Sequence, residues 1–217
     1  MIQFSNVAKT YHDRTALSSV SFAIERGEMA FLTGSSGAGK STVLKLAMHI
    51  EKPTHGQIIM NQFNVSQLKK RDVPKLRRQI GMIYQNPQLL SNQTIFENVA
   101  LPLVIGGFCR HEINRRVHAA LDKVGLLSKE KLFPLALSGS EQQRLGIARA
   151  IVNKPDILLA DEPTGNLDRD LSIDILRLFE AFNAVGVTVL IATHDAALIQ
   201  SMSHRVITLE NGKVLCE

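Results

Sequence analysis

Residues 34–41 read GSSGAGKS, and this stretch fits the phosphate-loop pattern G-x-x-x-x-G-K-[ST] in full. Glycines let main-chain N–H groups turn inward around the oxygens of a triphosphate, and a helix that begins near Lys40 adds its positive end. The apolar run Met29–Leu32 precedes the loop, and a helical pattern from Ser41 to about Ile50 follows it. The loop therefore predicts a nucleoside triphosphate site, and by itself it leaves kinase, GTPase and ATPase open.

Each residue of this loop has an expected role. Lys40 can reach the β- and γ-phosphates with its ammonium group, the Ser41 hydroxyl can ligate Mg²⁺, and Thr42 can donate to a phosphate oxygen. The remaining loop residues are expected to contact the nucleotide directly: Gly34, Ser35, Ser36, Gly37, Ala38 and Gly39.

Two acids follow a second apolar run. Residues 157–162 read ILLADE, which predicts a buried strand that ends in Asp161 and Glu162. Phosphoryl transfer needs positioning and charge stabilisation more than covalent help from the protein. Asp161 is therefore predicted to hold the Mg²⁺ shell, and Glu162 to orient and deprotonate the attacking water. An ordinary polar turn is the alternative, which the preceding apolar strand and the upstream phosphate loop disfavour.

The composition is that of an ordinary globular chain. Of its 217 residues, 45% are hydrophobic and 21% are charged, which disfavours disorder. No apolar run approaches the roughly 20 residues of a bilayer span, and the N-terminus lacks the apolar core of a signal peptide. Cys109 and Cys216 are read as free thiols of a reducing cytoplasm.

Basic residues are in modest excess. The formal net charge is +5, and six of the basic residues fall within KKRDVPKLRR at 69–78. Such a run is usually a solvated face, and an anionic partner surface is the sharper alternative. We expect no nucleic-acid partner.

The spacing of apolar residues predicts an α/β fold. Residues 1–25 alternate loosely, as in short antiparallel strands. Further along the chain, apolar strands at Gln57–Met60, Ile157–Ala160 and Val187–Ala192 alternate with helical patterns, among them 112–124 and 170–184. This alternation favours a mainly parallel sheet.

Several short motifs, taken together and in order, resemble those of the ABC ATPase family. Residues 137–144 read LSGSEQQR and resemble the ABC signature, while THD at 193–195 resembles the switch-histidine motif and GNLD at 165–168 the D-loop. Gln85 lies in GMIYQNPQLL, which resembles the Q-loop. The resemblance covers nearly the whole chain. It implies a P-loop NTPase fold, with a RecA-like core, an antiparallel β subdomain and an inserted α-helical subdomain.

The resemblance also implies roles for individual residues. His194 would be the switch histidine, Gln85 would bind nucleotide and metal, and Tyr11 would stack on the adenine of ATP. A second copy of the chain would contact the same ATP in trans through its signature and D-loop residues: Ser138, Gly139, Ser140 and Asp168. Each of these residues also has a purely structural alternative. Tyr11 could be a core residue, and His194 could be an ordinary residue at the end of a strand. Ser138-x-x-Glu141 could be a capping box that only stabilises the helix that follows.

The family further implies one ABC ATPase domain over 1–217. The core and β subdomain would occupy about 1–85 and 156–217, and the helical subdomain about 86–155. ATP and Mg²⁺ would be the cofactors, and an ATP-dependent homodimer would form and drive an integral membrane partner. Within the family, the chain looks most like ATPases of bacterial cell division, which act at the cytoplasmic face of the inner membrane. The ATPase of a lipoprotein-release or macrolide exporter is the runner-up.

One residue departs from the family pattern. The second glycine of the usual signature is Ser140 here. If that position required a positive φ, the cost would be about 1–2 kcal/mol; otherwise the hydroxyl adds a donor. We expect weaker or slower nucleotide-driven dimer closure than with glycine.

Overall fold

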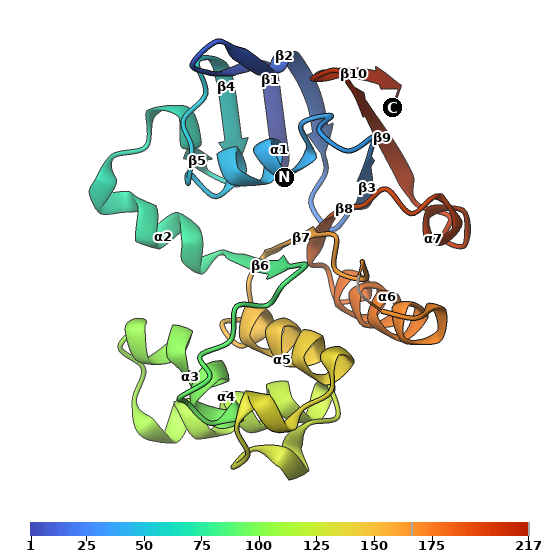
Figure 1. Cartoon of the computed structure of the whole chain (residues 1–217). Helices are drawn as coiled ribbons and strands as arrows, with labels where there is room; N and C mark the ends of the chain where they lie inside the picture. Colours follow the sequence, from blue (N-terminus) through green and yellow to red (C-terminus); the bar gives the residue numbers. More distant parts are fainter. Residues whose placement is uncertain (166, 217) are drawn as a thin grey trace. The chain divides into compact units, whose positions relative to one another are not determined.

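The structure is a computed structural model that describes residues 1–165 and 167–216, without the side chain of Cys216. It divides into two compact units, one made of residues 1–77 and 180–217 and the other of residues 78–179 (Figure 1). Within the described part of the chain, no helix is both long enough and apolar enough to cross a membrane.

The first unit contains an antiparallel sheet of four strands in the order β2-β1-β4-β5. The strands are β1 (Ile2–Tyr11), β2 (Arg14–Ile24), β4 (His55–Met60) and β5 (Phe63–Asn64). Ile2 lies opposite both Ile24 and Met60, and all three side chains are fully buried. Alternate residues of these strands thus form one apolar face, which confirms the antiparallel strands predicted for residues 1–25.

The same unit contains parallel strands. β3 (Met29–Thr33) pairs in parallel with β8 (Thr188–Ala192) on one side and with β9 (Arg205–Glu210) on the other. β10 (Lys213–Cys216) adds an antiparallel edge to β9. Because strands covered on both faces need apolar residues throughout, Met29–Leu32 is a continuous buried run, as predicted.

The helices of this unit are short. α1 (Lys40–Ala47) follows the phosphate loop, and α7 (Ala196–Gln200) follows β8. The helical pattern was expected to reach Ile50, but the helix ends earlier because His49 adopts a positive φ of 49°, which an α-helix cannot accommodate.

In the second unit, β6 (Ile80–Tyr84) and β7 (Ile157–Asp161) are parallel neighbours. Three helices pack on one another: α3 (Ile95–Ile105), α4 (Arg110–Lys123) and α5 (Gly139–Ile151). The helical pattern predicted for 112–124 is confirmed by α4, in which one side of the helix carries the buried Val117 and Leu121 and the half-buried Ile113, with the buried Val124 directly after it. Strands and helices therefore alternate along the chain, as the apolar spacing predicted for an α/β fold.

Two helices contain the sequence positions at which the chain passes from one unit to the other. They are α2 (Val73–Arg78) and α6 (Arg169–Ala184). Among the described residues there are also short 3₁₀ turns, at Val65–Gln67, Lys70–Asp72, Leu127–Lys129 and Pro134–Ala136.

The basic run at 69–78 is partly structural. Arg77 donates to the main-chain carbonyls of Met48 and His49, at 3.2 and 3.3 Å, and so satisfies acceptors at the C-terminal end of α1. Lys75 pairs with Asp72 at 2.9 Å. These contacts give Arg77 and Lys75 structural roles within the fold.

Candidate nucleotide-binding and hydrolysis site

The phosphate loop has a backbone that only glycine tolerates at key points. Gly34 and Gly39 have φ of 146° and 112°. A Cβ on Gly34 would lie 2.1 Å from the carbonyl oxygen of Leu209, and one on Gly39 would lie 2.6 Å from Leu17 Cδ2. Because both contacts are shorter than any van der Waals approach, the loop keeps its shape only with these two glycines.

The start of α1 presents hydrogen-bond donors. Its N-cap is Gly39, which makes no side-chain cap hydrogen bond, and the first turn contains no acid. The first main-chain N–H groups of a helix have no intrahelical partner, and the helix dipole places positive potential there. Ser41 and Thr42 lie in this turn. The local structure therefore suits phosphate oxygens.

Lys40 is held by the loop that precedes it. Its side chain is 8% exposed, and Nζ donates to the carbonyl of Gly34 at 2.6 Å and to that of Ser35 at 3.3 Å. Ser35, Ser36 and Gly37 are exposed. The loop is also anchored through Ala38, whose carbonyl accepts from the amide of Gly212 at 3.1 Å. The ammonium group is thus kept at the loop by main-chain acceptors.

His194 lies at the same edge of the sheet as the phosphate loop. β3 and β8 are parallel neighbours with Leu32 opposite Ala192, and the amide of Thr193 donates to the carbonyl of Leu32 at 3.1 Å. Each strand therefore ends at the same level, one leading to Gly34 and the other to the exposed His194. Ligands of parallel sheets bind at this carboxyl edge.

Tyr11 has one face of its ring occupied. Lys9 Nζ lies 4.6 Å from the ring centroid and pairs with Glu51 at 2.8 Å. A base stacked on Tyr11 would therefore use the other face. Tyr11 pairs across the hairpin with Arg14, whose guanidinium lies 3.6 Å from where a Cβ of Gly37 would be. Arg14 is not among the site residues predicted from the sequence, since only the hairpin brings it to the phosphate loop.

The second unit brings Gln85, Asp161 and Glu162 together. Tyr84 and Asp161 are paired at the ends of β6 and β7. Gln85 Nε2 is 2.9 Å from the Cβ position of Gly165, and the amide of Gly165 donates to the carbonyl of Glu162 at 3.2 Å.

Glu162 itself has a φ of 47°. A left-handed conformation in a non-glycine residue is uncommon and concentrates at functional sites. The extended strand therefore ends at Asp161.

The signature residues form the capped start of α5. Ser138 is the N-cap, and it exchanges hydrogen bonds with Glu141 in a complete capping box. Lys129 pairs with Glu141 at 2.6 Å, and its hydrogen bond lowers the pKa of Glu141, aided by the main-chain N–H of Ser138. The capping box considered in the sequence analysis is therefore present.

Ser140 causes no backbone strain. It lies inside α5 and is not among the residues of the described chain that have a positive φ. The cost of about 1–2 kcal/mol that a positive φ would impose on a serine therefore does not arise. Its Oγ is 3.1 Å from that of Ser138. A Cβ on Gly139 would meet nothing within 4 Å. The fold of this unit therefore does not require glycine at 139.

Asp168 begins the next helix. Its Oδ1 accepts from the amide of Leu171 at 3.0 Å, and its carbonyl accepts from the Ser172 hydroxyl at 2.8 Å. Within the predicted D-loop GNLD, Asn166 lies outside the described residues.

Comparison with known families decides the classification. The family model described as "ABC transporter" matches residues 17–165. The chain belongs to the ABC ATPase family. This ABC ATPase also matches the "Cell division ATP-binding protein FtsE" of Escherichia coli K12, with 61% identity over 98% of the chain and 96% of the relative. The protein of that name from Streptococcus pneumoniae D39 is 46% identical over 99% of the chain and 94% of the relative.

Solved structures agree with this classification. The ABC ATPase matches the ATP-binding cassette MJ0796, solved as a dimer in a post-hydrolysis state bound to ADP and Pi. The TM-score is 0.90 and the identity 35%, over 100% of this chain and 97% of that one. The chain is thus an ABC-type ATPase homologous to FtsE cell-division proteins.

Proposed function

We propose that this ABC ATPase is the ATP-driven switch subunit of an FtsE-like complex in the bacterial inner membrane. The observation that carries the proposal is the 61% identity to the FtsE protein of Escherichia coli K12 along 98% of the chain. Similarity over the full length favours the same task, because it extends beyond the nucleotide motifs that all ABC ATPases share.

The nucleotide site supplies the energy of the switch. Lys40 and the loop residues 34–39 bind the phosphates of ATP with Thr42, and Tyr11 stacks on the base. Glu162 deprotonates the attacking water and His194 stabilises the charge that develops on the γ-phosphate. The glycine backbone and the uncapped start of α1 support this assignment.

Mg²⁺ is the metal that these residues fit. Asp161 at the end of β7, the Gln85 amide and the Ser41 hydroxyl offer only oxygen ligands, as a hard cation prefers. Bound Mg²⁺ would neutralise charge that develops on the phosphate oxygens.

The working form is an ATP-dependent homodimer. Ser138, Gly139, Ser140 and Asp168 of one copy contact the ATP held by the other copy. The capped N-terminus of α5 is suited to this, because it directs main-chain N–H groups outward and has an open approach at Gly139. ATP then holds the dimer together and hydrolysis releases it, as in a ligand-driven two-state switch.

The output passes through a membrane partner. An integral FtsX-like protein supplies the membrane spans, and the ATPase binds it from the cytoplasmic face at the division site. Closing and opening of the dimer regulate cell-wall hydrolysis during division, with no cargo carried. Residues 86–155 form the helical subdomain that faces the partner, and residues 1–85 and 156–217 form the core and β subdomain.

The test is to isolate the full chain with its native membranes. A tagged copy should recover one integral membrane protein, and depletion of the chain should produce unseparated cells that regain division with wild type but not with Lys40→Ala. Recovery of a substrate exporter instead, with normal division after depletion, would favour the lipoprotein-release or macrolide-type system. Phosphoryl transfer to an acceptor other than water would exclude both.

A further inference from the structure

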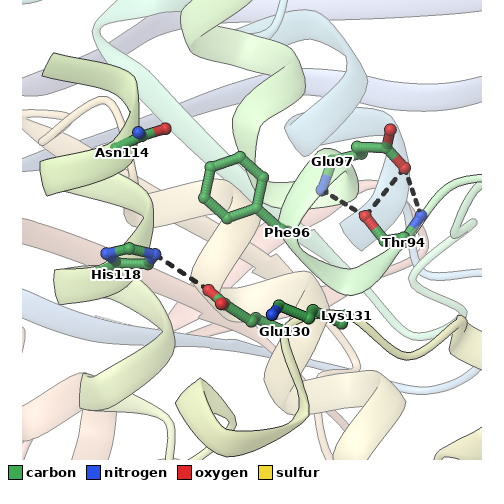
Figure 2. A pocket seen from close by; sticks show the side chains of 7 residues that line it. All are labelled: Thr94, Phe96, Glu97, Asn114, His118, Glu130 and Lys131. Atoms are coloured by element: carbon green, nitrogen blue, oxygen red, sulfur yellow. Dashed lines mark hydrogen bonds and ion pairs between the residues drawn. The ribbon is translucent and has the colours of Figure 1, made fainter. Parts of the chain in front are cut away.

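The helical part of the second unit contains a pocket of about 320 Å³ that the nucleotide chemistry does not use. Its walls are the start of α3, the middle of α4 and the segment before the signature. The lining residues are Thr94, Phe96, Glu97, Asn114, His118, Glu130 and Lys131 (Figure 2). This volume is at the small end of ligand pockets, about 300–1,000 Å³.

Main-chain hydrogen bonds fix the walls of the pocket. The amides of Ile95 and Phe96 donate to the carbonyls of Leu132 and Glu130, at 2.8 and 2.9 Å. Thr94 and Glu97 complete a capping box at the start of α3. These hydrogen bonds occupy the main-chain N–H groups of the first turn of α3. An anion in the pocket would therefore find no free N–H donor at this helix terminus.

Glu130 is the group whose bonding is incomplete. Its Oε2 lies 2.9 Å from Nε2 of His118, yet within the described chain that buried oxygen receives no hydrogen bond of acceptable geometry. A buried acceptor without a donor is costly. The His118 side chain is 49% exposed, so it can rotate aside for a ligand that supplies a better donor.

Phe96 adds an aromatic surface. Its ring centroid is 5.7 Å from that of His118, edge to face, and Figure 2 shows the ring between the α4 side chains and those of Thr94 and Glu97. The charges in the lining are the carboxylates of Glu97 and Glu130 and the ammonium of the exposed Lys131. A carboxylate beside an aromatic face is a combination that suits a cation.

We propose that this pocket binds the guanidinium of an arginine side chain from a cytoplasmic segment of the membrane partner. A planar guanidinium can stack on Phe96 and direct two N–H groups to the Glu130 carboxylate, which a compact ammonium does not match. Cytoplasmic loops of membrane proteins are rich in arginine and lysine. The assignment of the arginine to a membrane partner depends on the proposed function. The assignment of a guanidinium site depends only on the residues of the pocket.

Nearby apolar side chains indicate a protein rather than a free metabolite. Leu132 and Phe133 directly follow Lys131 and are 44% and 50% exposed. Interfaces commonly place an arginine in a pocket with apolar contacts around it.

The first experiment titrates the full-length chain with N-acetyl-arginine amide while NMR follows the signals of Phe96 and His118. The control probe is N-acetyl-citrulline amide, which has the same shape without the charge. We expect saturable shifts with the arginine probe only. Glu130→Gln should weaken binding about tenfold, since a charge-assisted hydrogen bond is lost. Equal shifts with both probes, or an unaltered Glu130→Gln variant, would overturn the guanidinium site.

The matched control variant is Glu112→Gln on α4. This carboxylate is already bound by Arg115 and Arg116 and does not line the pocket, so the arginine titration should be unchanged. ATP hydrolysis by both variants should equal that of the wild type, which excludes a general folding defect.

The second experiment measures dissociation of the purified complex with the membrane partner. Glu130→Gln should raise the dissociation constant about tenfold and Glu112→Gln should not. If the arginine probe binds but Glu130→Gln leaves the complex intact, the partner is not the occupant and that part of the inference fails. If no membrane partner is recovered at all, the proposed function fails with it, while the titration still decides the guanidinium site.

Discussion

The side-chain amide of Gln143 donates a hydrogen bond of 3.0 Å to the main-chain carbonyl of Tyr84. Gln143 is 3% exposed and lies one turn after Ser140 on α5, and Tyr84 is the last residue of β6, directly before Gln85. The helix that begins with the signature is therefore bound to the end of the strand that leads to Gln85.

Replacement of Gln143 tests this connection. Gln143→Met keeps most of the side-chain volume but leaves the Tyr84 carbonyl beside a group that cannot donate, so we expect a loss of about 1–3 kcal/mol in the free energy of unfolding. Urea denaturation measures it. The control is Gln200→Met on the exposed side of α7, which should change stability by less than about 0.5 kcal/mol. Equal stabilities for both variants would show that the bond contributes nothing.

Glu162→Gln should strongly reduce turnover and keep the fold. The amide retains the shape of the side chain at the strained φ of 47° but cannot take a proton from water. Loss of a general base lowers the rate about 10²–10⁴-fold. We expect phosphate release to fall by this amount and a dimer to accumulate with ATP in light scattering. A monomeric variant with surviving hydrolysis would show that another residue is the base.

Gly34 and Gly139 should respond oppositely to alanine. Gly34→Ala places a Cβ 2.1 Å from the Leu209 carbonyl and should destabilise the chain by more than about 2 kcal/mol and abolish ATP binding. Gly139→Ala adds a methyl group in open space within a helix, where alanine is favoured over glycine by about 0.5–1 kcal/mol.

The Gly139→Ala chain should therefore be as stable as wild type or more so, and still fail to dimerise with ATP. Thermal unfolding and ATP-dependent light scattering separate the two effects. Normal dimerisation of this variant would contradict the proposed trans contact.

Ser140→Gly should promote dimer closure. In the structure the Ser140 hydroxyl lies 3.1 Å from the Ser138 hydroxyl. Ser140 can therefore occupy the Ser138 hydroxyl, which is proposed to contact the ATP held by the other copy. We expect the glycine variant to close faster with ATP in stopped-flow light scattering, and to lose about 0.5 kcal/mol or less of stability in the helix. Ser140→Ala should close similarly without that loss. Unchanged kinetics in both variants would refute a role for the hydroxyl.

Stability at acid pH should depend on Glu112. Hydrogen bonds from Arg115, and then from Arg116, lower the pKa of Glu112 from 4.5 to about 2. A lowered carboxyl pKa contributes stability above the unfolded-state pKa, and this contribution is lost as the pH falls from about 4.5 toward 2. The difference in melting temperature between wild type and Glu112→Gln should therefore narrow from pH 7 to pH 3.

The control for this pH effect is Asp174→Asn, which breaks an exposed ion pair with Arg177. It should alter the melting temperature little at any pH. A constant difference for Glu112→Gln across the range would show that the ion pairs do not stabilise the fold.

The sequence by itself located the phosphate loop, the acids Asp161 and Glu162 at the end of an apolar strand, and part of the order of strands and helices. These features are local: a glycine pattern, an apolar run and a capping box each act within a few residues, so their spacing reveals them. The buried run Met29–Leu32 and the capped start of α5 at Ser138 follow from such spacing.

Only the tertiary structure decided which distant groups meet. Arg14 reaches the phosphate loop through a hairpin, Arg77 binds the end of α1, and Gln143 holds the Tyr84 carbonyl, across 59 residues of chain. The pairing of His118 with Glu130 beside Phe96 is of the same kind. Such contacts depend on how helices and strands pack, and side-chain packing across long sequence separations has no periodic signal in one sequence.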